Sequence, residues 1–151
     1  MCGDMRLSTR ARYGVRLMVS LAERFGDGPV FLKDIASEQG ISEKYLSLIV
    51  IPLRSAELIL STRGAYGGYT LSKAPERISL KEIVDTLEGE PCLVDCVKEP
   101  SACSRTDICP TRDVWKTVGE RISETLGRVT LESLANRSLE KKERAADLAK
   151  K

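Results

Sequence analysis

The chain has 151 residues, which suffices for one compact domain with an appendage and is too short for two large domains. Hydrophobic residues make up 42% of it and charged residues 30%, as in ordinary globular proteins, and no run approaches the roughly 18 apolar residues that a membrane-spanning helix needs. The N-terminus lacks the apolar core of a signal peptide, so we expect a cytoplasmic protein with no membrane partner.

The net charge of +2 hides a division along the chain. Residues 5–77 carry 11 Lys and Arg against 7 Asp and Glu, residues 78–110 carry 3 against 7, and residues 111–151 carry 10 against 7. These counts give a basic N-terminal part, an acidic cysteine-bearing loop and a basic tail, although an excess of this size also fits charges scattered for solubility.

Residues 9–25 are predicted to form an amphipathic helix that is capped by Ser8 and followed by a glycine-rich turn. A short helix over about 32–39 comes next, and Ser42 can cap a third helix that runs to about residue 57. Two helices joined by a tight turn that contains glycine form the helix-turn-helix pattern, which many other helical hairpins share.

Short strands are predicted at 58–62 and 69–71, joined by the sequence Arg-Gly-Ala-Tyr-Gly-Gly. A helix-turn-helix that leads directly into such a hairpin is a winged helix, although an ordinary hairpin with a solvated arginine also fits the segment. The glycines allow close approach to a phosphate backbone, and Arg63 can enter a minor groove. We therefore predict a winged helix-turn-helix DNA-binding domain over residues 5–77, in a mostly α (α+β) fold.

In a winged helix the second helix of the pair enters the major groove of double-stranded DNA, and its N-terminal residues meet the base edges. The start of the first helix can hold phosphates through side chains and free backbone N–H groups. The candidate DNA-binding residues are therefore Ser8, Thr9, Arg10, Arg12, Ser42, Lys44, Tyr45, Ser47, Arg63 and Gly64.

The second half of the chain is predicted to be helical on both sides of a polar loop. Ser79 opens a connecting helix within residues 78–91 through a capping box, and Thr111 can cap a long helix within residues 111–136, where Thr130 begins a last turn. The apolar stripe of the long helix includes Val114, Trp115, Val118, Ile122, Leu126 and Val129. Such a stripe favours dimerisation, unless the helix packs back on its own winged helix. The highly charged residues 137–151 are predicted to be frayed or disordered.

The loop at residues 92–110 holds four of the five cysteines, in the pattern C-x3-C-x6-C-x5-C at Cys92, Cys96, Cys103 and Cys109. Because their neighbours are mostly polar, these thiols are available as metal ligands, redox groups or disulfide partners. We expect Cys2, near the terminus, to have no role. A catalytic cysteine normally needs a base, and the chain has neither histidine nor a phosphate loop, dinucleotide fingerprint or carboxylate pair, so we do not expect an enzyme.

With these features in order, the chain resembles the Rrf-type family of winged-helix transcriptional regulators, which includes IscR, NsrR and CymR. The resemblance covers about residues 5–136 and rests on Met5-Arg6-Leu7-Ser8, Arg12-Tyr13, Asp34-Ile35-Ala36, Gly40-Ile41-Ser42, Tyr45-Leu46, Leu53-Arg54, Arg63-Gly64-x-x-Gly67-Gly68-Tyr69, Cys103-x5-Cys109-x5-Trp115 and Thr130-Leu131. It implies a homodimeric repressor that binds a palindromic operator and whose long helix pairs the subunits. In many members three loop cysteines hold an iron–sulfur cluster, of the 2Fe–2S or 4Fe–4S type, whose state sets DNA affinity. By position these ligands would be Cys96, Cys103 and Cys109.

The chain departs from the family pattern at the fourth ligand. Arg112 stands where IscR-like members often have a histidine ligand, and Arg12 stands where nitric-oxide-sensing relatives use an aspartate. Cys92 is the obvious substitute, with Asp95 and Asp107 as oxygen alternatives, unless it is a plain loop residue.

The predicted recognition helix also departs from the pattern. Pro52 removes a backbone hydrogen bond in its last third and is expected to kink it, and Glu57 stands where relatives often have the glycine that ends the helix. Cluster-sensing relatives can carry a site-discriminating glutamate at the position of Ser47, so operator preference is not transferred.

Two other uses of the cysteines stay open. Structural zinc usually takes C-x2-4-C pairs or histidines, and only the first spacing here fits. The other use is a cluster-free switch, based on a reversible disulfide or on a partner enzyme that reports sulfur status. Our main expectation is a repressor whose operator affinity depends on an iron–sulfur cluster that senses iron–sulfur supply, redox state or nitric oxide.

Overall fold

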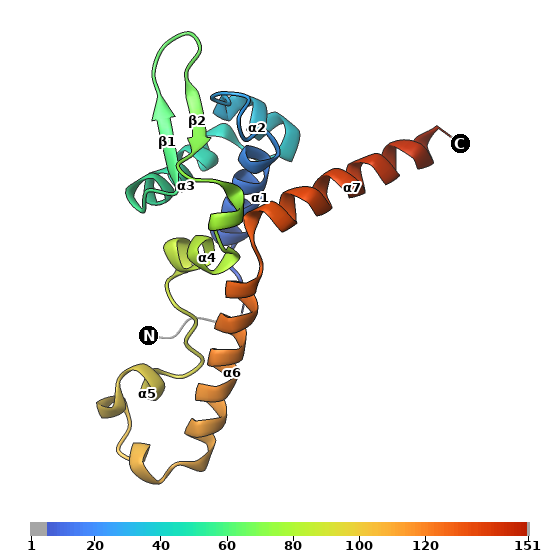
Figure 1. Ribbon diagram of the computed structural model, residues 1–151. Coiled ribbons are helices and arrows are strands. Elements are labelled where there is room, and N and C mark those ends of the chain that lie inside the picture. Colours follow the sequence, from blue (N-terminus) through green and yellow to red (C-terminus); the bar gives the residue numbers. More distant parts are fainter. Residues whose placement is uncertain (1–5, 151) are drawn as a thin grey trace.

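The computed structural model describes residues 6–150 (Figure 1); residue 5, where the DNA-binding domain was predicted to start, Cys2 and the last residue lie outside the described residues. The helices are α1 (Thr9–Glu23), α2 (Leu32–Gln39), α3 (Glu43–Ser55), α4 (Leu80–Glu88), α5 (Asp95–Lys98), α6 (Pro110–Arg128) and α7 (Leu131–Ala149), with 3-10 turns η1 (Pro75–Arg77), η2 (Pro100–Ala102) and η3 (Thr106–Ile108). The strands are β1 (Ile59–Thr62) and β2 (Gly68–Leu71).

The molecule consists of a compact winged helix, an elongated arm and one projecting helix (Figure 1). Helices α1 to α4 and the β1–β2 hairpin form the winged helix, and the arm comprises residues 92–128, which include the cysteine loop and α6. The predicted mostly helical fold with a two-stranded wing is confirmed.

The core lies where α1, α3 and α4 pack against one another. Each of these helices contributes residues spaced three or four apart, which places them on one side of the helix. The fully buried side chains with the largest volumes include Leu17, Met18, Leu46, Leu53 and Ile83. This packing holds α3 so that its other side faces solvent.

Polar caps set the helix starts that the sequence predicted. The hydroxyls of Ser8 and Ser42 each accept a backbone N–H at 3.0 Å, and Ser79 forms the predicted capping box at the start of α4. The first helix ends at Glu23, two residues earlier than predicted, because the chain turns there towards Gly26, whose φ of 94° suits only glycine well.

The wing is fastened to the winged-helix body through Gly68. The two strands pair antiparallel over four residues each, and Val30 and Tyr69 exchange two backbone hydrogen bonds of 2.9 Å beside them. Gly68 has a φ of 137°, and a Cβ at this position would lie 2.4 Å from the carbonyl oxygen of Val30. Both the backbone angle and the close contact therefore require glycine.

The recognition helix α3 passes through Pro52 without interruption and ends at Ser55, two residues before the predicted end. Proline has no N–H to donate, but its carbonyl accepts the N–H of Ala56 at 2.9 Å, so the last turn still closes. The expected kink does not break the helix.

Glu57 occupies the position that suits a glycine after α3. Its φ of 58° makes it the only non-glycine residue with a positive φ among residues 6–150. This conformation turns the chain into β1, and Leu58 donates its N–H to the carbonyl of Leu53 at 3.0 Å. A side chain in the left-handed region costs about 1–2 kcal/mol.

Glu57→Gly is therefore expected to raise the free energy of unfolding by about 0.5–1 kcal/mol, because the strain relieved exceeds the extra flexibility of the unfolded chain. Urea titration followed by circular dichroism measures this change. Glu57→Ala is the control, since alanine removes the carboxylate and keeps the strain. Equal stabilisation by both variants would assign the effect to charge and contradict the prediction.

The arm begins with the cysteine loop, which folds into the short turns α5, η2 and η3. The predicted cap of the long helix is wrong: α6 begins at Pro110 with Cys109 as its N-cap residue, and Thr111 lies within the first turn. Proline starts a helix well because its φ is fixed and its missing N–H needs no partner there.

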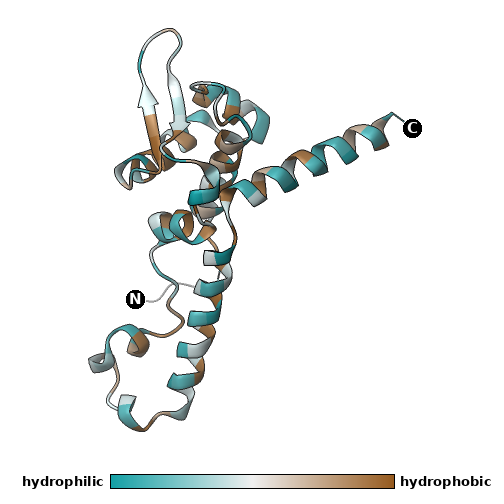
Figure 2. Cartoon of the chain, in the orientation of Figure 1, coloured by the Kyte–Doolittle hydropathy of each residue, from teal (hydrophilic) through white to brown (hydrophobic). Residues whose placement is uncertain are grey.

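Helix α6 lies along the arm with none of its 19 residues buried. Val114 is 53% exposed, Trp115 42% and Val118 36%, and hydrophobic segments recur along the helix in Figure 2. The first half of the predicted apolar stripe is therefore exposed, whereas Ile122, Leu126 and Val129 in its second half are half-buried within the described part of this chain.

Helix α7 corrects the prediction for the C-terminal tail. Thr130 caps it as expected, but the helix continues to Ala149, whereas residues 137–151 were predicted to be frayed or disordered. The buried Leu131 anchors its start, Lys142 pairs with Glu23 of α1 at 2.5 Å, and the sequence is rich in strong helix formers. None of the helices in residues 6–150 combines the length and the apolar character needed to cross a membrane.

Candidate nucleic-acid interface and cysteine loop

The outer side of α3 is the central part of the candidate DNA interface. Lys44, Leu48 and Ile51 are exposed, and their spacing of four and three residues places them along one side of the helix. Ser42, at the N-cap, uses its hydroxyl to accept the N–H of Tyr45. The start of α3 therefore carries a free ammonium group close to unpaired backbone N–H groups.

Two side chains that were predicted to meet DNA are already engaged within the protein. Tyr45 is half-buried and packs edge-on against Tyr13, with ring centroids 5.8 Å apart. The hydroxyl of Ser47 donates a hydrogen bond of 2.6 Å to the carbonyl of Lys44. Ser47 can then only accept a hydrogen bond from a base, which restricts it to amino groups.

The start of α1 holds the second predicted group of residues. Thr9, Arg10 and Arg12 are exposed, and Arg12 donates to the hydroxyl of Thr9 at 3.3 Å. The N–H of Ser8 is bonded to the side chain of Glu88, at the end of α4, so this N–H is not free for a phosphate. The start of α1 can therefore contact phosphates through Arg10, Arg12 and the backbone N–H groups that follow Ser8.

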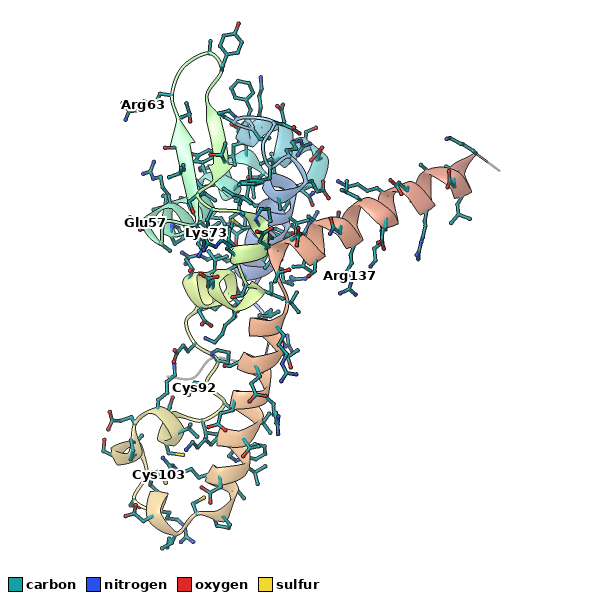
Figure 3. All side chains as sticks on the ribbon, viewed as in Figure 1. Glu57, Arg63, Lys73, Cys92, Cys103 and Arg137 are labelled. Atoms are coloured by element: carbon teal, nitrogen blue, oxygen red, sulfur yellow. The ribbon has the colours of Figure 1, made fainter. Side chains whose placement is uncertain are left out.

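The wing holds the third group. Arg63 and Gly64 lie in the exposed hairpin loop, and Figure 3 shows Arg63 extending outward from it. Tyr66, which is not among the predicted DNA-binding residues, is 92% exposed in the same loop. An aromatic residue among glycines at a hairpin tip was the signal that could have identified it. The predicted residues are thus spread over α3, the wing and the start of α1 rather than gathered at one point.

The cysteine loop places its thiols on three different elements of the arm. Cys96 lies in α5, Cys103 follows η2, and Cys109 is the N-cap of α6; all three are free thiols, whereas Cys92 is disulfide-bonded. Figure 3 shows Cys92 and Cys103 at separate places in the arm. Arg112, which stands where many relatives have a histidine, donates from Nε to the carbonyl of Cys96 at 2.9 Å and so joins α5 to α6.

The surroundings of Cys109 favour its thiolate form. A hydrogen bond from the hydroxyl of Thr111, with the backbone N–H of Arg112 as the next contribution, lowers the pKa of Cys109. The N-cap position adds the favourable end of the α6 dipole. Because thiolates are the nucleophilic and metal-binding form of cysteine, Cys109 suits both roles.

An iron–sulfur cluster fits this loop by its donor chemistry. Three free thiols, one of them with a lowered pKa, match the thiolate ligands that such clusters take. Within residues 6–150, however, no three His, Cys, Asp or Glu side chains lie close enough together to hold a metal ion as they stand. Cys92 could serve as a fourth ligand only after its disulfide is reduced. Its role there and the roles of Asp95 and Asp107 stay predictions.

A helix-turn-helix with an exposed second helix, a wing that carries arginine and an uncovered long helix together define a winged-helix transcriptional regulator. The model of the Rrf2 family, described as iron-dependent transcriptional regulators, matches residues 7–137. The chain belongs to this family. Residues 138–149, the second half of α7, extend beyond the match.

Individual relatives agree with this assignment. The transcriptional regulator CymR of Bacillus subtilis is 39% identical over 132 residues, which are 87% of this chain and 91% of CymR. The structure of CymR (YrzC), the global cysteine regulator of B. subtilis, matches with a TM-score of 0.74 over 88% of this chain and 98% of that one. IscR of T. potens matches with a TM-score of 0.73 at 37% identity over 89% of each chain.

Proposed function

We propose that the chain is a homodimeric repressor that binds a palindromic DNA operator with an affinity set by an iron–sulfur cluster in the cysteine loop. The observation that carries this proposal is the position of Cys109, which is both a candidate ligand and the N-cap residue of the long helix α6. A change at the loop thiols therefore acts directly on the helix that is expected to join the subunits. The description of the family as iron-dependent supports an iron–sulfur cluster as the bound group.

Dimerisation through α6 is supported by its exposed apolar side chains Val114, Trp115 and Val118. Further along the helix, the half-buried Ile122 and Leu126 line a mostly apolar hollow of about 230 Å³, and Leu7, Val84 and Leu93 are among its other lining residues. A helix with this much exposed apolar surface gains free energy when a second copy covers it. The two-fold symmetry of such a dimer would present two copies of α3 to the two halves of a palindromic operator.

The residues of the arm supply a mechanical connection between loop and helix. Cys96, Cys103 and Cys109 would hold the cluster, which supplies a centre sensitive to oxidation and nitric oxide when bound. The hydrogen bond from Arg112 to the carbonyl of Cys96 ties α5 to the first turn of α6. We infer that holding or releasing the three thiols shifts the loop against α6 and so changes the spacing of the two recognition helices.

Anaerobic purification with an absorption spectrum and iron, sulfide and zinc analysis tests this proposal. Wild-type protein is expected to be brown, with iron and sulfide in comparable amounts, and to change its affinity for a selected DNA duplex after exposure to air. Cys103→Ala is expected to be colourless and to bind the duplex equally before and after exposure. Ser104→Ala, a similar truncation at the neighbouring position, is the control and should behave as wild type.

A thiol switch without a cluster is the second candidate, and the lowered pKa of Cys109 favours it. Protein that stays colourless after anaerobic reconstitution, and whose DNA affinity still changes on oxidation, would replace the cluster by this switch. Zinc in stoichiometric amount would indicate a structural metal instead. Cys103→Ala protein that responds to air as wild type does would rule out both cysteine mechanisms that use Cys103.

A further inference from the structure

Helix α3 carries aliphatic side chains on two opposite sides. Its inner side is buried, with Leu46, Ile49, Val50 and Leu53 all at 4% exposure or less. Its outer side carries Leu48 and Ile51, which are 56% and 53% exposed. We call these two residues the aliphatic face. The core is complete without them, so folding of this chain does not explain their character.

The flanks of the aliphatic face indicate what covers it. Lys44 stands four residues before Leu48, and Arg54 stands three residues after Ile51; both cations are exposed. A cation at each end and an apolar centre match the major groove of DNA, where phosphates border the groove and the C5-methyl groups of thymine are its apolar contacts. Because α6 lies in the arm, away from α3 in Figure 1, pairing of subunits through α6 leaves the aliphatic face open.

Between Lys44 and Arg54, the polar side chains of α3 leave little of the usual means for reading bases. Guanine and adenine are recognised by two hydrogen bonds from one Arg, Lys, Asn or Gln side chain. The hydroxyls of Ser42 and Ser47 are engaged with the α3 backbone, through an accepted N–H and through a donated hydrogen bond respectively. Leu48 and Ile51 are therefore the largest uncommitted side chains in the middle of the outer side.

We propose that Leu48 and Ile51 determine operator specificity by packing against thymine methyl groups, so that each half-site has A·T pairs beneath the middle of α3. This inference rests on the proposed function, because it requires that α3 enters the major groove. Beyond the proposed function, it specifies that α3 selects thymine, and that it does so through van der Waals contacts and not through hydrogen bonds.

The test uses DNA that differs only in these methyl groups. Full-length protein selects duplexes from a random library, and the selected pool is amplified with either dTTP or dUTP, which leaves base pairing unchanged and removes the thymine C5-methyl groups. Wild-type protein is expected to bind the thymine pool more tightly, by about fourfold for each methyl group that it buries. The double variant Leu48→Ala/Ile51→Ala is expected to bind both pools equally.

Leu148→Ala is the matched control, since Leu148 is 73% exposed at the far end of α7; it should keep the wild-type preference. Equal binding of both pools by wild type would overturn the proposal, as would a preference of wild-type size in the double variant. Failure of wild type to select any duplex would instead overturn the proposed function and this inference with it. The wild-type comparison needs no variant, so it stands even where a substitution impairs folding.

Discussion

Gly68→Ala is expected to destabilise the protein by about 3 kcal/mol, which corresponds to a fall in Tm of roughly 10 °C. Two costs add at this position. The residue has a φ of 137°, and an added Cβ would lie 2.4 Å from the carbonyl oxygen of Val30, which is backbone and cannot move aside as a flexible side chain can. Relief of the contact would break the paired hydrogen bonds between Val30 and Tyr69.

The same substitution is expected to weaken DNA binding, because the wing would lose its attachment to the segment between α1 and α2. Differential scanning calorimetry and a DNA-binding titration measure the two effects. Gly64→Ala is the control: its φ is 108°, but a Cβ there meets no atom within 4 Å. Gly64→Ala should therefore show only the cost of the backbone angle, about 1–2 kcal/mol. Equal losses in the two variants would contradict the role assigned to the contact with Val30.

Local signals in the sequence predicted most of the winged helix. Ser8, Ser42 and Ser79 were identified as caps because a hydroxyl that accepts an N–H within the next turn is a property of a few adjacent residues. The need for glycine at position 68 could not be derived in this way, since it depends on Val30, which is distant in the sequence. The resemblance to a family supplied Gly68 as part of a motif but gave no physical reason for it.

The prediction for the C-terminal tail was wrong. The high charge of residues 137–149 indicated disorder, but many of these residues are strong helix formers, and the buried Leu131 anchors the start of α7. Composition alone could not reveal that anchor, because the burial of Leu131 depends on the packing of α7 against α1.

The sequence predicted which residues form the candidate DNA interface, but not which of their side chains are free to contact DNA. Lys44 and Arg63 are exposed as expected, whereas Ser47 donates its hydroxyl to its own helix and Tyr45 packs against Tyr13. The sequence also did not show that Ile51 is exposed while most other aliphatic residues of α3 are buried, because this depends on which side of the helix packs against the core.

Val118→Arg is expected to convert the proposed dimer into a monomer and to lower operator affinity by about 100-fold or more. Val118 lies in the middle of the apolar stripe of α6, and a guanidinium there would have to be buried against the partner without an acceptor. Two half-sites bound by one dimer are linked, so the loss of dimerisation removes the gain from linked binding. Sedimentation velocity and a DNA titration at one salt concentration measure both effects.

Thr117→Arg separates the loss of the dimer from the change in charge. Thr117 is exposed one position away, on a different side of α6, and this variant should remain dimeric. An added positive charge by itself strengthens binding to DNA, so a loss of affinity in Val118→Arg cannot come from electrostatics. A Val118→Arg protein that stays dimeric would place the subunit contact elsewhere. A monomer that binds the full operator as tightly as wild type would show that the two recognition helices do not act together, and the proposed control by the cysteine loop through α6 would fall with it.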